Sequence, residues 1–518
     1  MNKKIIIILA AVLVLILAAG AFVLFILPEQ DTEVDEADLY QPDQWQVDSD
    51  DLDDTTLTIY FEAMGNSKLE NILKAVNRKL RDELKTELSF KFYWEYPETY
   101  LNRIRQDIAS GMPCDAFYIS SYFPVAIESL AKEGMIMDVS EMFPKYAYQY
   151  YSQFTSEDID ALSVNGRVYV IPSRIPGTDR KCAMVRQDLM DKYSIPAIGS
   201  YSDYEAFLET IKTNEPNMFP MNYYDTTLGL FADLNGYAVL DYEAGLVYRW
   251  DDPEMKIVTW EQTPAFREGL DRIASWYDKG YLIKNLGISQ IDGTMVTSGK
   301  WASFICSPGQ QMEFNSMLRG SEITDFTYKA YPLYDNVSSR TSIMGAGMAV
   351  NAKSEQAERV LMFIDWLQSS QENYDLLMYG IKGTDYIEKD GYIEPPEGVS
   401  MSESFFNWGW KEPFRNIDLE RTNYPGLKED IQNYNELIST HTKYPPHIGF
   451  YPDYSPVIQI ITHRKLSFTE LDVKIYRGTF EQQDVEKYVD DQKQQGSDRL
   501  VKEIQEQLDK YMAEKHGR

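Results

Sequence analysis

The sequence predicts an α/β protein built from two lobes that a hinge joins. The chain has 518 residues, which is too long for one hydrophobic core. From Thr56 onward, short β-branched segments alternate with amphipathic segments at helical spacing. Between Asn165 and Phe207 a first run of this kind ends and a second one begins. Together these observations favour two α/β lobes with a crossing of the chain between them.

The boundary between the two runs carries turn and strand signals. Asn165-Gly166 is a tight-turn pair, and Arg167 to Ile171 is apolar and β-branched enough for a buried strand. Pro172 and Pro176 then interrupt regular pairing, because proline has no backbone N–H. A strand that leaves one sheet and crosses to another has this pattern. An ordinary hairpin within one domain is the alternative.

The first lobe is expected to alternate strands and helices from Thr56. The expected strands are Leu57–Phe61, Leu88–Tyr93 and Asp115–Ile119, with helices after Ser67 and at Tyr100–Ser110 and Pro124–Lys132. Alternation at this spacing indicates parallel strands with right-handed crossovers. In such sheets, ligands bind beyond the carboxyl ends of the strands. The strand ends therefore place the following candidate residues on one rim: Glu62, Trp94, Glu95, Ser121 and Tyr122.

The second run repeats this scheme less regularly. Helices are expected at Asp203–Lys212 and Phe266–Lys279, and a strand at Trp301–Cys306 that ends in the turn Ser307–Gln310. A strand at Phe326–Pro332 is expected to cross back. The strand Met344–Asn351 and the helix Gln356–Leu367 would then complete the first lobe.

Several motifs resemble one protein family. The sequence NGRVYVIP from Asn165 is followed by MVRQDLMDKYSIPA from Met184. Together they resemble the hinge-crossing segment of extracellular solute-binding proteins that serve ATP-binding-cassette importers. Later segments resemble the extra C-terminal region of the sugar-receptor branch of this family: LMYGIKGTDY from Leu377, SFFNWGW from Ser404 and GFYPDYSPV from Gly449. The resemblance covers nearly everything after Thr56, and the motifs keep their order.

The resemblance implies the two-lobed, periplasmic-binding-protein-like class II fold with a multi-strand hinge. The expected lobe 1 comprises 56–171 and 328–370, and lobe 2 comprises 172–327 and 371–480 with a C-terminal extension, followed by C-terminal helices at 481–518. The implied function is the capture of an extracytoplasmic solute for delivery to the permease subunits of an importer. The expected solute is an oligosaccharide. A surface glycan-binding adhesin or a sensory co-receptor with the same fold remains open, because fold alone does not fix function.

The resemblance also adds candidate ligand-binding residues. Tyr223, Tyr224 and Asp225 are expected to face the first rim from the second lobe. Further candidates are Ser307 and Gln310 after the Trp301 strand, and Trp408 and Trp410 in the C-terminal loop. Arg174 borders the crossing and either binds an acidic sugar or ties the hinge to a carboxylate.

The N-terminus predicts attachment to a membrane. Lys3 and Lys4 precede an apolar run to Leu27, which as a helix spans roughly 34 Å, enough for the hydrocarbon core. The lysines favour a cytoplasmic start, so that residues 28–55, an acidic linker, would lie on the outer face of the cytoplasmic membrane. A signal cleaved after Ala19-Gly20-Ala21, which would make the protein secreted, is the alternative. No cysteine precedes Cys114, so the family's usual lipid attachment is not expected.

Charge and motifs exclude other classes of function. The net charge of −31 argues against nucleic acid and anionic lipid as partners, because both would repel it. The 13% aromatic content, with 37 tyrosines, suits ligands such as sugars that have apolar ring faces and polar edges. The spacing of the four histidines matches no zinc signature, and no nucleophile elbow or phosphate-binding loop occurs. We expect neither a metal nor another cofactor and no enzymatic activity, although a glycosidase pair such as Glu62 with Asp225 is conceivable.

Overall fold

The computed structural model describes residues 51–65, 68–120, 127–175, 177–178, 180–223, 226–284, 293–341, 346–399, 405, 409–422 and 426–516. The chain divides into two units, Met1–Asp53 and Asp54–Arg518, and the fold below is that of the second unit. The expected anchor, Met1–Leu27, and the linker up to residue 50 lie outside the described residues. In the part that is described, no helix combines the length and apolar character needed to cross a membrane.

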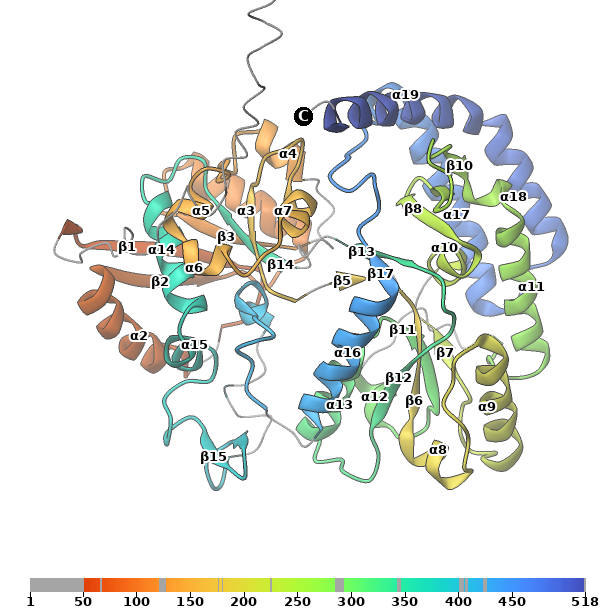
Figure 1. The fold of residues 1–518 in the computed structure, drawn as a ribbon, viewed down its shortest axis with the longest axis horizontal. Helices are drawn as coiled ribbons and strands as arrows, with labels where there is room; N and C mark the ends of the chain where they lie inside the picture. Colours follow the sequence, from red (N-terminus) through yellow and green to blue (C-terminus); the bar gives the residue numbers. More distant parts are fainter. Residues whose placement is uncertain are drawn as a thin grey trace, which may run out of the picture. The chain divides into compact units, whose positions relative to one another are not determined.

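Lobe 1 is built on a five-stranded sheet with the order β2-β1-β3-β14-β4 (Figure 1, left). Its strands are β1 (Thr55–Phe61), β2 (Thr86–Phe92), β3 (Ala116–Ser120), β4 (Val170–Pro172) and β14 (Ala346–Val350). The predicted parallel pairing of the first three strands is confirmed, because β1 is parallel to both β2 and β3. In contrast, β14 runs antiparallel to β3 and β4, since the chain enters it from the hinge side of the sheet.

The helices of lobe 1 pack their apolar stripes on this sheet. On α2 (Leu69–Leu84), the buried residues Leu69, Ile72, Val76 and Leu80 recur every three or four positions and so share one face of the helix. The remaining helices are α3 (Pro97–Ala109), α4 (Ile127–Lys132), α5 (Phe143–Tyr146), α6 (Tyr148–Tyr151), α7 (Ser156–Leu162), α14 (Ala357–Gln368) and α15 (Gln371–Met378). Apart from those of α7, their buried side chains form one continuous cluster with those of the strands.

Lobe 2 contains a four-stranded sheet with the order β12-β6-β11-β7 and a smaller one with the order β10-β9-β8. The larger sheet consists of β6 (Cys182–Arg186), β7 (Asn222–Tyr223), β11 (Ser303–Cys306) and β12 (Tyr328–Pro332). The smaller consists of β8 (Tyr237–Asp241), β9 (Leu246–Arg249) and β10 (Val258–Thr259). The principal helices are α8 (Gln187–Lys192), α9 (Tyr201–Asn214), α10 (Thr227–Phe231), α11 (Pro264–Asp278), α12 (Gly293–Thr297) and α13 (Gln310–Gly320).

The chain crosses between the lobes as the sequence predicts. Asn165 and Gly166 both have positive φ angles, 54° and 76°, which is the geometry of a tight hairpin turn. The strand that follows, β4, pairs in lobe 1, and the chain reaches lobe 2 at β6. Pro172 was expected to interrupt pairing but lies within β4. It is accommodated because β4 is the edge of the sheet, where a missing N–H costs no ladder bond.

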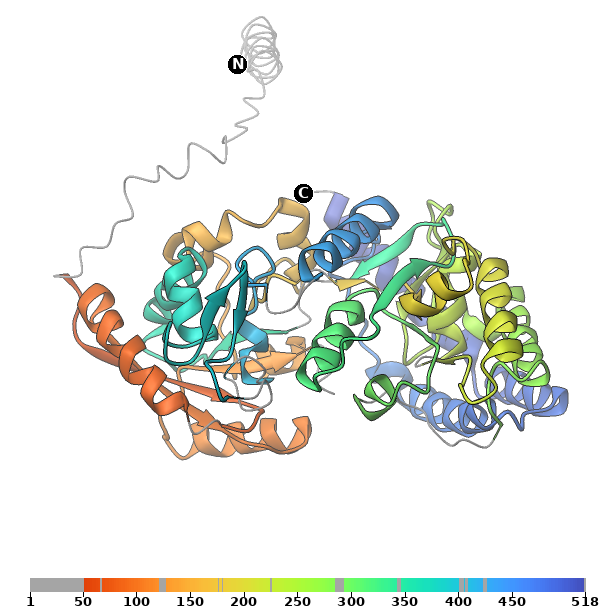
Figure 2. The same ribbon diagram turned by 90° about the horizontal axis from the view of Figure 1, so that it is seen from below.

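A small three-stranded sheet marks the hinge. It has the order β17-β13-β5 and comprises β5 (Gly177–Thr178), β13 (Ser338–Thr341) and β17 (Thr442–Lys443). These strands come from three distant parts of the chain, so the multi-strand hinge is confirmed. In Figure 1 the labels β5, β13 and β17 lie between the two lobes, and Figure 2 shows the same ribbon turned by 90°.

The C-terminal part corrects the predicted lobe boundary at residue 370. Tyr374, Trp410 and Phe414 were expected in lobe 2 but belong to the buried cluster of lobe 1. Residues 371–414 include β15 (Ile387–Lys389), β16 (Tyr392–Glu394) and η6 (Gly409–Phe414). The physical reason is aromatic packing: the ring of Trp410 fills a space beside Phe61 at a centroid distance of 5.9 Å.

The last helices complete lobe 2 (Figure 1, right). They are α16 (Leu427–His441), α17 (Ile458–Arg477), α18 (Gln482–Gln494) and α19 (Ser497–His516). Leu471 and Ile475 of α17 and Val485 of α18 are part of the lobe 2 cluster. On α19, Leu500, Ile504 and Leu508 are fully buried, and their four-residue spacing places them on one face of the helix.

Candidate ligand-binding site

The carboxyl ends of β1, β2 and β3 share one edge with the hinge connections of lobe 1. Phe61 lies opposite Phe92 in register, and the N–H of Tyr93 donates to the carbonyl of Phe61 at 2.9 Å. On the other side of β3, Ser120 lies opposite Ala346, the first residue of β14. The described residues that follow β1 and β2 therefore lie near the edge from which the chain leaves for lobe 2.

Lobe 2 has the matching arrangement. Tyr223, at the end of β7, lies opposite Ile305, and Cys306 lies opposite Cys182, the first residue of β6. Pro332, the last residue of β12, also lies opposite Cys182. The ends of β7 and β11 thus share an edge with the strands that enter and leave the lobe. Both predicted rims adjoin the hinge, as a site that closes between two lobes requires.

The rim of lobe 1 exposes aromatic rings. Trp94 is 70% exposed and Tyr96 is 87% exposed, and Met64 beside the end of β1 is 54% exposed. Tyr96 precedes Pro97, the first residue of α3, so the chain turns there and projects this segment outward. Exposed large apolar side chains are few in the described part of the molecule, and three of them gather at these strand ends. Such a patch indicates a surface that binds something.

A carboxylate lies beside these rings. Oε2 of Glu95 is buried and has no hydrogen-bond partner among the described residues, while Oε1 lies 3.9 Å from Nη2 of Arg103. Glu62, after β1, is half-buried and has an interaction of its own. An acceptor that is buried without a donor costs free energy, which a ligand hydroxyl would recover.

Behind the rim, Tyr93 is fixed in place. Its hydroxyl donates to Oδ2 of Asp107 at 2.8 Å, and burial together with this hydrogen bond raises the pKa of Tyr93 to about 12. The guanidinium of Arg103 lies over the Tyr93 ring, 5.8 Å from its centre. These contacts hold the strand end from which Trp94 and Glu95 project.

Two predicted site residues are buried in the structure instead of lining a rim. Trp410 is 1% exposed and packs against Phe61, Phe90 and Phe414 in the lobe 1 core. Tyr223 is also 1% exposed, and its ring stacks on Tyr476 of α17 at 5.3 Å. Neither ring presents a face that a ligand can reach in this structure. Both therefore support the rims from behind.

Arg174 ties the crossing to lobe 1. Its Nε and Nη2 lie 2.8 and 2.6 Å from Oδ2 of Asp418, and its Nη1 donates to the carbonyl of Gln153 at 2.6 Å. Of the two roles open for this residue, the structure shows the hinge role, because each nitrogen of its guanidinium already has an acceptor.

The other predicted residues divide into two sets. Ser307 and Gln310 are half-buried after β11, and the N–H of Ser307 donates to Oε1 of Gln310 at 3.1 Å. The remaining candidates lie outside the described residues: Ser121, Tyr122, Tyr224, Asp225 and Trp408. They directly follow β3 or β7, or precede η6, in the sequence.

A cavity at the hinge was missed by the sequence analysis. Its volume is about 270 Å³, and it is lined by Phe154, Asp158, Arg174, Arg340, Asn435, Ile438, Ser439 and Tyr444. The hydroxyl of Tyr444 donates to Oδ1 of Asp158 in α7 at 2.6 Å. Arg174 is the one lining residue that the sequence analysis named. The lining is spread over 290 positions of the chain, so no local signal predicts the cavity.

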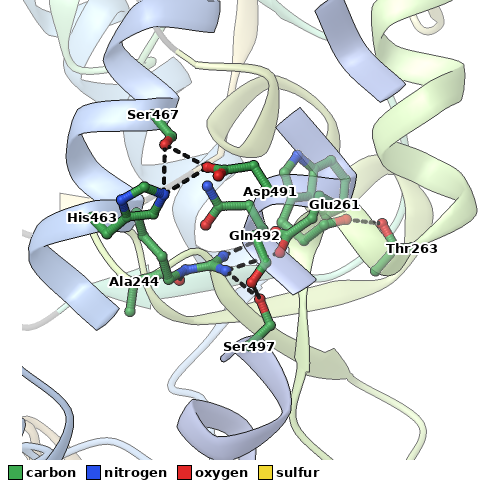
Figure 3. A network of polar contacts seen from close by, with 10 residues as sticks. Ala244, Glu261, Thr263, His463, Ser467, Asp491, Gln492 and Ser497 are labelled. Carbon is green, nitrogen blue, oxygen red and sulfur yellow. Dashed lines mark hydrogen bonds and ion pairs between the residues drawn. The ribbon is translucent and has the colours of Figure 1, made fainter. Parts of the chain in front are cut away.

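A polar network on α17 contains serine, histidine and aspartate but is not a catalytic triad (Figure 3). Oδ2 of Asp491 lies 2.6 Å from Nε2 of His463, and Ser467 lies 3.2 Å from the same nitrogen and donates to Asp491 at 2.9 Å. A triad needs its acid and its nucleophile on opposite ring nitrogens. Here both contact one nitrogen, so the group serves to join α17 to α18. The described residues contain no group of side chains suited to hold a metal ion.

Next to this network, a buried ion pair joins α17 to lobe 2. Nη1 and Nη2 of Arg464 each lie 2.9 Å from an oxygen of Glu261, and both side chains are almost fully buried. Arg464 also donates to Oγ of Ser497 and to the carbonyl of Ala244, each at 2.9 Å. This geometry satisfies the guanidinium on every side.

Comparison with known proteins identifies the family. The family model of bacterial extracellular solute-binding proteins matches residues 82–374. The chain belongs to this family. A second model, for a domain of unknown function (DUF3502), matches residues 446–513, which contain α17 and α18 and most of α19.

Individual relatives cover nearly the whole chain. A carbohydrate ABC transporter substrate-binding protein of Streptococcus pneumoniae is 20% identical over 477 residues, which are 90% of this chain and 93% of the relative. The solved N-glycan transport solute-binding protein of the same species has a TM-score of 0.72 at 18% identity, covering 89% of this chain and 100% of that one. An alginate-binding protein has a TM-score of 0.58 at 15% identity, covering 88% and 99%. The predicted class II α/β fold is confirmed by these structures.

Proposed function

We propose that this solute-binding protein captures an oligosaccharide between its two rims and delivers it to the permease subunits of an ABC importer. The observation that carries the proposal is the pair of exposed rings, Trp94 and Tyr96, at the strand ends beside the hinge. Its relatives support it, since one is a carbohydrate ABC transporter substrate-binding protein and another an N-glycan transport solute-binding protein. No catalytic step is part of this role.

The chemistry of the lobe 1 rim suits a sugar. The apolar face of a pyranose ring can lie on an exposed aromatic ring, which buries apolar surface on both partners. Each sugar hydroxyl that leaves water needs a new partner, or its desolvation is lost outright. The partly exposed carboxylate of Glu95, next to Trp94 in the chain, is such a partner.

The second wall of the site would come from lobe 2. Ser307 follows β11, the strand that reaches the hinge edge, and Gln310 begins α13. Tyr224 and Asp225 follow Tyr223 directly in the sequence. We include these four with Ser121, Tyr122, Glu62 and Trp408 in the proposed site. Closure would bend the crossings that flank β5 and β13 and leave both main sheets intact.

The proposal also places the protein at a membrane surface. Met1–Leu27 would stay attached as an anchor on the outer face of the cytoplasmic membrane, and residues 28–55 would act as an acidic stalk. An importer's receptor works there, because its permease lies in the same membrane. The permease is thus the expected protein partner.

A thermal-unfolding screen tests the function. The full chain is melted with a panel of oligosaccharides, amino acids and short peptides, because any ligand that binds only the folded state stabilises it by mass action. A ligand at one hundred times its Kd adds about 2.7 kcal/mol, which raises Tm by a few degrees. We expect at least one oligosaccharide to do so. Stabilisation by peptides or amino acids alone would contradict the proposal.

A further inference from the structure

We infer that Cys182 and Cys306 become joined by a disulfide bond in the exported protein, and that this bond braces lobe 2 beside the hinge. The inference goes beyond the proposed function, because it does not involve a ligand. The chain has three cysteines, and the structure shows all three as buried thiols, which is the reduced form. Cys182 and Cys306 are neighbours in one sheet of lobe 2, whereas Cys114 lies in the core of lobe 1.

Strand register places the two cysteines directly opposite each other. β11 pairs antiparallel with β6 in a continuous register, from Ser303 opposite Val185 to Cys306 opposite Cys182. Opposite residues of two antiparallel strands have Cα atoms about 4.5–5.5 Å apart. A disulfide needs Cα atoms about 4.4–6.8 Å apart. The backbone therefore already meets the first requirement for a bond between these two residues.

Both cysteine side chains also point to the same face of the sheet. Successive residues of a strand point to opposite faces. Cys182 and Cys306 belong to one buried cluster, together with Phe304. Their neighbours in the two strands, Ala183 and Ile305, belong to the buried cluster on the other face. The backbone therefore need not be rebuilt for the two sulfurs to meet.

Neighbouring contacts hold both strands in this register. β6 lies between β12 and β11, and Pro332 of β12 lies opposite Cys182 on the other side. In β11, Oγ of Ser303 donates to the carbonyl of Pro220 at 2.7 Å and lies 2.8 Å from the Tyr204 hydroxyl. A slip by one residue would turn every side chain of a strand to the wrong face of a buried sheet. The pairing of the two cysteines is thus fixed by the fold.

The compartment of the family favours the oxidised form. The family consists of bacterial extracellular solute-binding proteins, and disulfides form and persist outside the cytoplasm. We name a small disulfide, such as oxidised glutathione, as the oxidant. The thiolate of Cys182 attacks one of its sulfurs and releases one glutathione thiolate, and the thiolate of Cys306 then attacks Sγ of Cys182 and releases the second. The two cysteines lose two protons and two electrons, and the oxidant is reduced to two thiols.

Burial determines when this reaction can take place. Cys182 is 0% exposed and Cys306 is 1% exposed, so an oxidant in solvent does not reach them in the folded protein. Burial also raises the pKa of Cys182 to about 12, although Arg180 and Lys181 lower it, and burial raises the pKa of Cys306 well above its usual value. The reactive thiolate is therefore scarce once the chain has folded. The bond forms during folding outside the cytoplasm, and the same burial then protects it from reductants.

The bond would lie at the hinge edge of lobe 2. Cys182 is the first residue of β6, where the chain enters the lobe, and Cys306 is the last residue of β11, directly before Ser307. A bond between them closes a loop of about 125 residues, and a closed loop of this length strongly restricts the unfolded chain. The hinge strands β5, β13 and β17 lie outside the loop. The bond therefore stabilises the lobe and leaves the hinge free to bend.

Counting free thiols in the exported full chain tests the inference. The protein is exported by a bacterial host, quenched in acid, denatured and labelled with N-ethylmaleimide in the absence of reductant. We expect the parent to take up one label, on Cys114, and to take up three labels after reduction. Peptide mapping should show a linked pair of peptides that contain Cys182 and Cys306. Three labels without reduction, or a bond that includes Cys114, would overturn the inference.

Three variants assign the bond to its residues. Cys182→Ala and Cys306→Ala should each take up two labels without reduction, because the remaining partner becomes a free thiol. Cys114→Ala is the matched control, since it also removes a buried thiol, and it should take up no label. The labels are counted on denatured chains, so the count does not require a variant to be stable. A count of zero for Cys182→Ala would show that Cys306 pairs with Cys114 and would contradict the inference.

Thermal unfolding tests whether the bond braces the lobe. The parent is refolded either with oxidised glutathione or with a reductant, and we expect Tm to be about 5 °C lower for the reduced form. Cys114→Ala should show the same difference between the two forms, and Cys182→Ala should show none. Equal Tm values for the oxidised and reduced parent would contradict the bracing role. No ligand is present in these experiments, so their failure would leave the proposed function standing.

Discussion

Oδ2 of Asp418 lies 2.8 Å from Nε and 2.6 Å from Nη2 of Arg174, across 244 positions of the chain. Backbone bonds reinforce this contact, because the N–H of Arg174 donates to Arg415 at 2.8 Å and the N–H of Ile417 donates back to Arg174 at 3.2 Å. The segment that crosses from lobe 1 to lobe 2 at Arg174 is therefore bound to the residues that directly follow η6. The ion pair is partly exposed, so it contributes less than about 1 kcal/mol and does not lock the angle between the lobes.

Ligand should therefore compact the molecule. We expect small-angle scattering to show a lower radius of gyration with saturating oligosaccharide, and the far-UV circular dichroism to stay the same. The reason is that closure bends the crossings and leaves the strand pairing of both sheets unchanged. Trp94→Ala at the same ligand concentration serves as the control, and its radius of gyration should fall less than that of the parent. An unchanged radius for the saturated parent would contradict closure.

The Arg464–Glu261 pair should matter far more for stability than an exposed pair on the same helix. Glu261→Gln leaves a buried guanidinium without its carboxylate, which we expect to cost about 3–5 kcal/mol of unfolding free energy. Glu243→Gln removes the exposed partner of Lys465, the next residue of α17, and should cost less than about 1 kcal/mol. Urea unfolding compares the two. Equal losses would show that the buried pair does not clamp the C-terminal helices.

His447 should make the fold sensitive to acid. It is buried, its Nδ1 lies 2.8 Å from the Tyr248 hydroxyl, and burial with the nearby Lys515 lowers the pKa of His447 to about 3. Between pH 6.5 and 3 the unfolded chain binds a proton that the folded chain does not. The stability contributed by the neutral ring is thus fully present above pH 6.5 and is lost as the pH falls toward 3.

The variant His447→Gln isolates this effect. Its stability relative to the parent should rise by about 2 kcal/mol between pH 8 and pH 5, as measured by urea unfolding at each pH. The comparison with the parent is needed because burial raises the pKa of Asp365 to about 6. The contribution of Asp365 to the free energy of unfolding therefore increases as the pH falls from 6 to 3.8. Parallel pH profiles for parent and variant would refute the assignment to His447.

Local patterns predicted much of the fold, and contacts between distant segments account for what was missed. The apolar spacing of α2 and α19 and the β-branched runs of β1 and β2 lie within short windows, so periodicity reveals them. The position of Trp410 depends instead on Phe61 and Phe90, more than three hundred positions away. Nothing in SFFNWGW indicates that the ring of Trp410 packs into lobe 1. The rim was predicted through the strand-end rule, which needs only strand order and direction.

The anchor prediction depends on residues 1–27, outside the described part of the chain. We expect N-terminal sequencing of the protein extracted from membranes to show that the chain still contains the apolar run that begins at Ile5. The reason is that Phe22 to Leu27 continues the apolar segment beyond the small residues at 19–21. A chain that begins at Phe22 would show that the segment is a cleaved signal.

The affinity of Trp94→Ala for the oligosaccharide that binds best tests the central claim most directly. Trp94 is 70% exposed, so its removal should hardly change Tm, whereas loss of a stacking anchor should weaken binding about thirtyfold, or about 2 kcal/mol. Trp410→Phe is the matched control, since Trp410 is 1% exposed and its Nε1 has no partner in the described structure. It should lower Tm and leave affinity within about twofold of the parent. Unchanged affinity in a folded Trp94→Ala protein would contradict a ligand site at the rim of lobe 1.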